Sequence, residues 1–260
     1  MATVHRFFVP GPLAGGDVAL PAQITRQATA VLRLRTGEPV VVFDGSGGEW
    51  TAELRVSGRT ATARLLEERF PAREPEVHVT LAQAVLKADR FEWVLQKGTE
   101  LGVGAFQPLL TRRTVAGGAG RLDRWRRIVI EAAEQCGRCR VPDVSPPRAL
   151  EDVLARPGPA VLLWEGERRR PFAAALAAAL ALAPAGGGVR LLIGPEGGFD
   201  PDEVGAALAA GAIPASLGPR ILRAETAALA AATLSCLAPP PPPGEPVAEA
   251  DSGTHPSQKA

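Results

Sequence analysis

The segment Leu191-Leu-Ile-Gly-Pro-Glu-Gly-Gly-Phe-Asp-Pro-Asp-Glu203 decides the fold class of this chain. Its apolar start, Leu191 to Ile193, has the character of a buried strand and leads through a glycine-rich loop directly into a helix. Asp200 is a good helix N-cap, Pro201 suits the first helical position, and Glu203 completes a capping-box spacing. The segment therefore predicts a strand, a tight loop and a helix, which is the repeating unit of an α/β sheet.

The loop from Gly194 to Gly198 predicts a ligand site. Glycines let a ligand approach the backbone, and open α/β sheets bind ligands at the carboxyl ends of their strands. The Gly-Pro-Glu-Gly-Gly spacing is not a phosphate-binding fingerprint, and Glu196 would repel a pyrophosphate. An acidic loop suits a positively charged ligand such as a sulfonium. A tight turn without a ligand is the structural alternative.

A second glycine-containing loop follows one helix later. A short strand is expected over Pro214 to Leu217, then a loop from Gly218 to Arg223, and a helix from Ala224 onward. Glu225 and Thr226 place polar groups at the start of that helix, where capping is the structural alternative to ligand binding. We expect the two loops, on successive strands, to face each other across one crevice.

The alternation of strands and helices extends upstream and predicts an α/β domain with a mostly parallel sheet. Its expected strands are 77–81, 106–110, 161–164 and 189–193, and its expected helices are 87–101 and 123–135. The chain before it is rich in β-strand signals and predicts a small barrel, with strands at 40–43, 51–56 and 61–66 and a helical period at 24–34.

Four segments are expected along the chain. Residues 1–70 form the barrel, and residues 71–76, with Pro71 and Pro75, form a linker. Residues 77–237 form the α/β domain. Residues 238–260 begin with a run of prolines and are expected to be disordered, because they cannot bury enough apolar area to offset the entropy of ordering.

Charge and cysteine content narrow the protein class. The net charge is only +1, but the segment from Arg112 to Arg140 contains eight arginines and only three acidic residues, which predicts either a nucleic-acid surface or a solvated helix face.

Three cysteines leave an odd thiol, which suits a reducing, cytoplasmic compartment. Cys136 and Cys139 have the spacing of a redox or zinc pair, but no second pair accompanies them, so no metal is expected. No run of roughly 20 apolar residues predicts a membrane span.

Several motifs together carry a family resemblance. They are His5–Phe8, Val31–Leu34, Phe43–Gly45, Gln96–Val103, Pro108, Glu134–Arg138, Leu192–Gly198 and Leu217–Ala227. In this order they resemble the bacterial 16S ribosomal RNA (uracil N3)-methyltransferases, the RsmE family of the SPOUT superfamily, over roughly residues 4 to 237. The resemblance implies an N-terminal PUA-like β-barrel, a SPOUT domain with a deep trefoil knot, and a homodimer. It also implies S-adenosylmethionine as cofactor and a uridine of the small ribosomal subunit as target.

The resemblance assigns site residues by position. The implied cofactor residues are Ile193, Gly194, Pro195, Glu196, Gly197, Gly198, Leu217, Gly218, Ile221, Leu222, Arg223, Glu225, Thr226 and Ala227. The expected RNA-binding residues are Arg6, Arg33, Arg35, Lys97, Arg112, Arg113 and Arg138.

Catalysis requires removal of the uracil N3 proton or stabilisation of the resulting charge. Arg223 is the first candidate for the stabilising cation, with Arg6 and Arg138 behind it, and Glu196 or Glu225 is the candidate base. His5 near the terminus is expected to be a barrel residue. Two alternatives stay open, namely a related SPOUT enzyme with another RNA or base as substrate, and a ribosome-assembly factor without activity.

Overall fold

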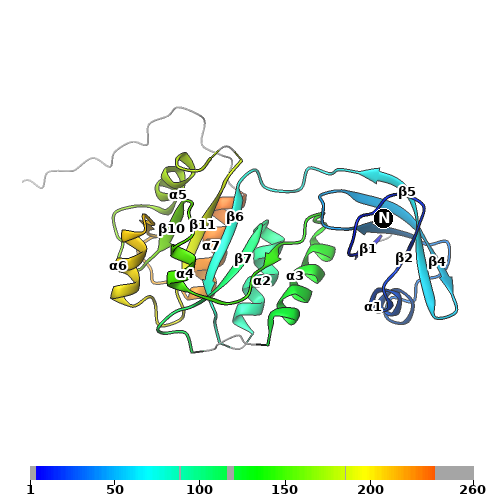
Figure 1. Cartoon of the computed structure of the whole chain (residues 1–260), viewed down its shortest axis with the longest axis horizontal. Coiled ribbons are helices and arrows are strands. Elements are labelled where there is room, and N and C mark those ends of the chain that lie inside the picture. The colour runs from blue at the N-terminus through cyan, green and yellow to red at the C-terminus, as the bar shows by residue number, and fades with distance from the viewer. Residues whose placement is uncertain (1–3, 88, 116–119, 185, 238–260) are drawn as a thin grey trace, which may run out of the picture.

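The computed structural model describes residues 4–87, 89–115, 120–184 and 186–237. Two sheets lie toward opposite ends of an elongated molecule, and the chain crosses between them once, after β5 (Figure 1). The expected disordered tail, residues 238–260, lies outside the described residues. Among the residues described, no helix is long and apolar enough to cross a membrane.

The N-terminal sheet has five strands in the order β1-β3-β4-β5-β2. These strands are β1 His5–Phe8, β2 Asp17–Ala19, β3 Pro39–Phe43, β4 Glu49–Ser57 and β5 Thr60–Arg69. The strands expected at 40–43, 51–56 and 61–66 are confirmed as β3, β4 and β5. Strand β1 pairs in parallel with β3, while the other pairs are antiparallel. Phe7, Val42 and Leu54 are fully buried in the core of this sheet.

The helix expected over residues 24–34 is shorter than its apolar period suggests. Helix α1, Ala22–Arg26, continues as a π-helical turn, η1, over Gln27–Val31. Arg33 then adopts φ 57, in the left-handed region. A left-handed residue cannot continue a right-handed helix, so the helix ends before Leu34.

The C-terminal sheet has seven strands, and every pair in it is parallel. The strand order is β12-β10-β11-β6-β7-β8, and β9 also pairs with β7. The strands are β6 His78–Ala84, β7 Ala105–Leu110, β8 Asp143–Val144, β9 Arg148–Ala149, β10 Ala160–Leu163, β11 Gly188–Ile193 and β12 Ile213–Ala215. The prediction of an α/β domain with a parallel sheet is confirmed.

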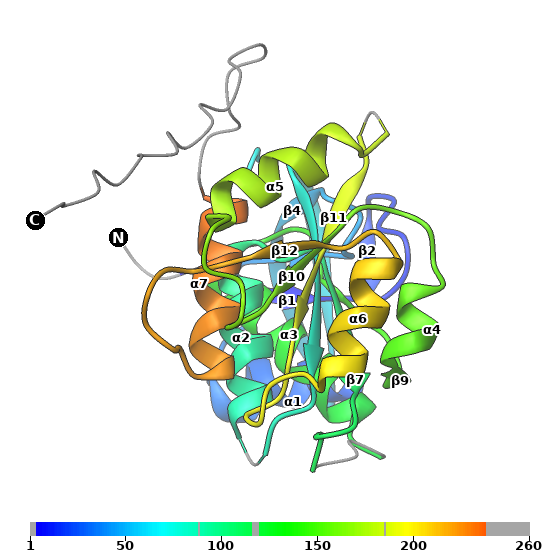
Figure 2. The same cartoon turned by 90° about the vertical axis from the view of Figure 1, so that its left-hand side faces the viewer.

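Helices cover both faces of this sheet, as Figure 2 shows with α2 and α7 on one side and α4 and α6 on the other. The helices are α2 Arg90–Leu101, α3 Leu122–Cys136, α4 Leu150–Leu154, α5 Phe172–Ala181, α6 Pro201–Ala209 and α7 Ala224–Cys236. One core cluster packs strand residues against α2, α3, α5 and α7, and another packs them against α4 and α6.

The apolar run Leu191 to Ile193 is buried because helices cover both faces of the sheet. Successive strand residues point to opposite faces, so Leu191 and Ile193 enter the first core cluster and Leu192 enters the second. A strand covered on both faces must be apolar throughout, which explains why no polar residue alternates within the run.

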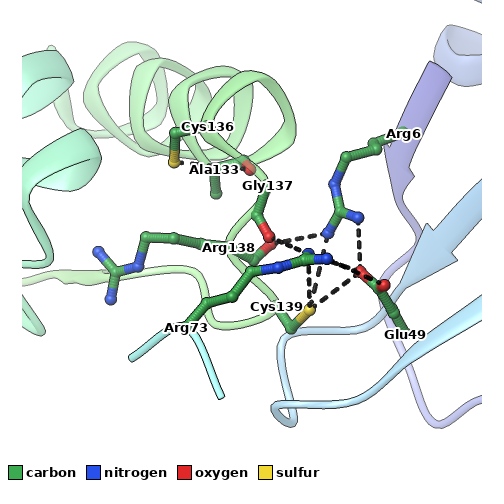
Figure 3. Close-up of polar contacts among 8 residues, drawn as sticks. All are labelled: Arg6, Glu49, Arg73, Ala133, Cys136, Gly137, Arg138 and Cys139. Carbon is green, nitrogen blue, oxygen red and sulfur yellow. Dashed lines mark hydrogen bonds and ion pairs between the residues drawn. The ribbon is translucent and has the colours of Figure 1, made fainter. Parts of the chain in front are cut away.

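A polar cluster joins the two sheets (Figure 3). We call Arg6, Glu49, Arg73 and Cys139 the junction cluster. The Glu49 carboxylate pairs with the guanidinium groups of Arg6 and Arg73 and accepts a hydrogen bond from the Cys139 thiol at 3.2 Å. Burial raises the pKa of Glu49, but hydrogen bonds from Arg6 and Cys139 and the two arginine charges outweigh it, so the net pKa lies below its ordinary value.

Candidate functional site

A cavity of about 810 Å³ opens at the carboxyl ends of three neighbouring strands, β12, β10 and β11. Three loops line it, namely residues 164–171 after β10, residues 194–199 after β11 and residues 216–223 after β12. The two glycine-containing loops therefore share one crevice, as expected. They do not lie on adjacent strands, because β10 is inserted between β11 and β12.

The first glycine loop is built for close backbone packing. Gly198 has φ +69, and a Cβ there would come within 2.7 Å of the Glu165 carboxylate. A Cβ on Gly194 would lie 3.1 Å from the Phe199 amide nitrogen. The loop is also tied to the sheet, since the buried Gln83 side chain donates to the Gly194 carbonyl oxygen at 3.0 Å. Side chains at these glycines would therefore deform the loop or fill the cavity edge.

The capping box that follows this loop is confirmed. The Asp200 side chain accepts from the Asp202 backbone N–H, and the Glu203 side chain accepts from the Asp200 backbone N–H at 2.8 Å. Glu203 is buried, and its other oxygen accepts the Arg112 backbone N–H at 2.8 Å. The start of α6 is thereby joined to the loop after β7, which fixes where the glycine loop ends.

The second glycine loop turns sharply after β12. Gly218 has φ +108, and its N–H donates to the Ser216 hydroxyl at 3.2 Å. The cofactor residues assigned from the resemblance that line the cavity are Ile193, Gly194, Pro195, Glu196, Gly197, Gly198, Leu217, Gly218, Ile221, Leu222, Arg223, Glu225 and Ala227. Of the residues assigned from the resemblance, Thr226 differs, because it lines an adjoining cavity of about 420 Å³ instead.

The loop after β10 was not predicted as part of the site. It brings Glu165, Glu167, Arg168 and Arg169 to the cavity. The available signal was a run of charged residues directly after a buried strand, the same position that the glycine loops occupy. The sequence does not reveal that β10 lies between β11 and β12, because strand order depends on contacts far apart in the chain.

Two carboxylates of the cavity share one arginine. Arg90, at the start of α2, lies 3.6 Å from Glu196 and 3.8 Å from Glu225. Glu196 also accepts the Lys87 backbone N–H at 3.0 Å. The Oε2 atom of Glu225 is buried without a hydrogen-bond partner among the described residues. Glu196 makes both of its contacts through Oε1, so each carboxylate keeps one oxygen without a partner among the described residues, and only Glu196 is also bound to the backbone.

Most of the cations expected to contact RNA already have protein partners. Arg112 and Arg113 pair with Asp200, and Arg113 also donates to the Gly197 carbonyl oxygen at 2.8 Å. Lys97 pairs with Glu100 at 2.8 Å. Arg33 and Arg35 are exposed, and neither forms an ion pair within the described ranges. Arg112 and Arg113 thus hold the glycine loop in place.

Arg6 and Arg138 lie at the junction between the sheets and line neither cavity. Arg138 is buried, pairs with Glu74 and donates to the carbonyl oxygens of Thr99 and Val103. Arg6 pairs with Glu49 and donates to the Arg138 carbonyl oxygen at 3.1 Å. Their chemistry suited RNA binding or catalysis, but their guanidinium groups are occupied by the fold.

The two thiols of the Cys-x-x-Cys motif have separate partners. The Cys136 thiol donates to the Ala133 carbonyl oxygen, and the buried Cys139 thiol donates to Glu49 (Figure 3). Burial raises the pKa of Cys139, and the bond to Glu49 raises it further. In the part of the chain that the structure describes, no group of three or more His, Cys, Asp or Glu side chains is arranged to hold a metal ion.

Comparison with family models identifies this architecture. Residues 73–235 match an RNA methyltransferase domain, and residues 28–66 match an RNA methyltransferase PUA domain. The chain belongs to the RNA methyltransferase family. The expectation of a PUA-like N-terminal domain before a methyltransferase domain is confirmed, and the cavity described above lies within the methyltransferase match.

Two similar proteins with the same name support membership of this RNA methyltransferase family. The chain is 42% identical over 222 residues to ribosomal RNA small subunit methyltransferase E of a Synechocystis species, covering 84% of this chain and 72% of the relative. It is 33% identical to the Bacillus subtilis protein of the same name, covering 76% of this chain and 81% of the relative.

Solved structures of the family show the same fold. A Neisseria gonorrhoeae ribosomal RNA small subunit methyltransferase E, crystallised with S-adenosyl methionine, has a TM-score of 0.79 and 36% identity, covering 88% of this chain and 95% of that structure. A Legionella pneumophila methyltransferase, also with bound cofactor, has a TM-score of 0.79 and 32% identity, covering 90% of this chain and 97% of that structure.

Proposed function

We propose that this protein transfers a methyl group from S-adenosylmethionine to N3 of a uridine in 16S ribosomal RNA. The observation that carries the proposal is the cavity itself, in which two glycine-containing loops and four carboxylates, Glu165, Glu167, Glu196 and Glu225, meet at the ends of parallel strands. Membership of the RNA methyltransferase family and two relatives crystallised with the cofactor support it.

The residues of the cavity fit such a cofactor. Its volume of about 810 Å³ lies in the range of small-molecule sites. Gly198 leaves open a space that a Cβ would fill against Glu165. The cavity offers both carboxylates and arginines, so Glu196 and Glu225 would face the positive charge of such a ligand, and the backbone groups of residues 194–198 and 217–218 would hold its uncharged parts. S-adenosylmethionine supplies an electrophilic methyl group, which a nucleophilic nitrogen can accept.

The chain must then make uracil N3 nucleophilic. Glu225 is the better candidate for accepting the N3 proton, because its contact among the described residues is Arg90 at 3.8 Å, whereas Glu196 also accepts the Lys87 backbone N–H. Arg223 is exposed at the cavity and has no ion pair with any residue that the structure describes, so its guanidinium is available to stabilise negative charge on the flanking uracil oxygens. Positioning these groups within reach of the methyl carbon supplies the remainder of the catalysis.

Glu196 and Arg6 take different roles in this proposal. Glu196 binds the Lys87 backbone and Arg90, so we assign it to shaping the glycine loop. Arg6 belongs to the junction cluster and is assigned to the contact between the sheets. Arg33 and Arg35 remain candidates for RNA contact from the N-terminal sheet, where both are exposed.

Mass spectrometry of 16S ribosomal RNA from a deletion strain tests the substrate. We expect loss of N3-methyluridine at one position and its return on complementation. Loss of a different modification would identify another base or RNA, and loss of none would leave a binding factor without activity.

In a tritium-transfer assay at saturating cofactor, Arg223→Ala should lower kcat by roughly 100- to 1000-fold, as removal of one charge-stabilising donor does in other enzymes.

A matched pair of variants separates the two carboxylates. Glu225→Gln should abolish most methyl transfer while leaving cofactor binding by calorimetry measurable. Glu196→Gln should retain transfer and change mainly the cofactor affinity. Equal kcat values for the two variants would rule out Glu225 as the proton acceptor.

The same proposal extends to domain division, assembly and location. We infer an RNA-binding barrel over residues 1–70, a linker over 71–76 and a knotted SPOUT domain over 77–237, in a cytoplasmic homodimer. Exposed apolar side chains on the adjacent helices α2 and α7, Trp93 and Leu234, support a second copy at this face. Light scattering should report twice the mass of one chain.

A further inference from the structure

The mouth of the cavity carries a set of arginines that belong neither to the expected site residues nor to the proposed chemistry. Arg168 and Arg169 belong to the loop after β10, and Arg220 belongs to the loop after β12. Strands β10 and β12 are parallel neighbours, with Leu163 opposite Ala215, so the two loops leave the sheet side by side. All three arginines line the cavity and are exposed. We call them the arginine rim.

Like Arg33, Arg35 and Arg223, the rim arginines lack carboxylate partners within the described residues. Arg112, Arg113 and Arg138 form ion pairs, whereas no rim arginine has a carboxylate within 4.0 Å in the described part of the chain. Two of the four carboxylates of the same cavity, Glu196 and Glu225, lie beside Arg90. The rim charges are therefore not neutralised by the protein itself.

The third carboxylate of the cavity, Glu167, holds the rim loop in shape. Its Oε1 atom accepts the backbone N–H groups of Arg169 at 2.6 Å and Arg170 at 3.1 Å. These bonds lower the pKa of Glu167, so it stays ionised at neutral pH. The Ser216 N–H donates to the Arg170 carbonyl oxygen at 2.9 Å, which ties the loop to the end of β12. The guanidinium groups thus extend from a fixed backbone.

We propose that Arg168, Arg169 and Arg220 bind RNA phosphates on either side of the target nucleotide and hold the strand across the cavity mouth. This inference rests on the proposed function. Arginine matches phosphate oxygens with paired donors, and unpaired exposed arginines release counterions when a polyanion binds. Phosphate contacts of this kind position a strand without reading its sequence.

Helix α3 provides the competing surface and the control. Arg126 and Arg127 are also exposed, but they line neither cavity. The variant Arg168→Gln/Arg169→Gln removes two rim charges, and Arg126→Gln/Arg127→Gln removes two charges from the helix. Both pairs are at the surface, so both variants should fold, and thermal unfolding checks this.

Filter binding of a 16S ribosomal RNA transcript over a series of KCl concentrations tests the proposal. We expect the rim variant to reduce the slope of log K against log salt by about two, roughly one for each phosphate that it no longer binds. Its affinity should approach that of the unaltered protein at high salt. The helix variant should change the slope less. An unchanged slope in the rim variant, or a reduced slope confined to the helix variant, would overturn the proposal.

Cofactor binding separates this inference from the proposed function. We expect the rim variant to bind S-adenosylmethionine with unchanged affinity by calorimetry, and a tenfold weaker affinity would assign the rim to the cofactor and overturn the proposal. If the unaltered protein bound no cofactor, the proposed function would fail, whatever the RNA slopes showed.

Discussion

Glu134 is a residue whose ionisation works against the fold. It lies on α3, and its side chain accepts the Phe8 backbone N–H at 2.8 Å across the junction between the sheets. Burial raises the pKa of Glu134, and the bond from Phe8 offsets this only in part. The folded chain therefore holds the Glu134 proton to a higher pH than the unfolded chain does. The stability that this residue contributes is present at low pH and is lost as pH rises through its folded pKa.

Glu134→Gln should remove this pH dependence, because glutamine keeps an oxygen acceptor for Phe8 and cannot ionise. We expect the variant to unfold at a higher temperature than the unaltered protein at pH 8. The difference should shrink as the pH falls from the folded pKa of Glu134 toward 4.5, the ordinary pKa of a glutamate, and should be absent below 4.5. Melting curves over this range measure it, with the exposed Glu68→Gln as control. A difference independent of pH would show that ionisation is not the cause.

The type of a side chain does not reveal whether the fold already occupies its polar groups, as Arg6 and Arg138 show. Arg6 and Arg138 have the side chain expected of an RNA contact or a catalytic cation, yet the fold surrounds both with acceptors. Burial depends on contacts more than 30 residues away for Arg138 and more than 40 for Arg6, and no local pattern reports it. Arg223 was assigned from the same kind of argument, and it lies exposed at the cavity.

Helix α6 begins at a cap that also ends the first glycine loop. The cap residue, Asp200, has its carboxylate bound to the helix and paired with Arg112 and Arg113, whose own side chains are about half exposed. Exposed ion pairs contribute little to stability, whereas an N-cap contributes about 1 kcal/mol.

Asp200→Ala should therefore lower the free energy of unfolding by about 1 kcal/mol. Asp200→Asn keeps a capping oxygen and should remain within about 0.5 kcal/mol of the unaltered protein. Urea denaturation measures both, and calorimetry should find weaker S-adenosylmethionine binding only for the alanine variant. Equal losses in the two variants would mean that the charge, not the cap, matters.

Elements set by neighbouring residues were predictable, and elements set by distant partners were not. The capping box and the strand before the glycine loop follow from residues 191–203 alone, and both are confirmed. Strand β1 has only four residues and pairs in parallel with β3, more than 30 residues away. No hairpin turn joins the two strands, so the sequence contains no turn motif that would predict their pairing. The insertion of β10 between the two glycine loops is likewise a property of the whole sheet.

At the scale of the whole molecule, the junction cluster holds the two sheets together. Glu49 is 7% exposed and Arg6 is 13% exposed, so their ion pair is nearly shielded from water, while Arg73 remains 42% exposed. Removing one partner of a buried pair leaves an uncompensated charge, which costs about 3 kcal/mol or more. Removing an exposed partner costs under about 1 kcal/mol.

We therefore expect Glu49→Gln to lower the free energy of unfolding by about 3 kcal/mol and Arg73→Gln by less than about 1 kcal/mol. Cofactor affinity should be unchanged in both, because neither residue lines the cavity. Methyl transfer to RNA should suffer in Glu49→Gln, because the N-terminal sheet loses its orientation. Denaturant melts together with the tritium-transfer assay distinguish the two variants, and similar losses in both would contradict a shielded pair.

The junction cluster cannot be completed during protein synthesis until the ribosome has added Cys139. Glu49 and its thiol partner Cys139 are separated by 90 residues in the chain. Strand β5 ends at Arg69, 70 residues before Cys139. At a translation rate of about 5 to 20 residues per second, the N-terminal sheet can be complete about 3.5 to 14 seconds before the ribosome supplies Cys139. During that interval the Glu49 and Arg6 side chains face water instead of the second domain. The contact between the N-terminal sheet and the second domain can therefore form only well after that sheet is complete.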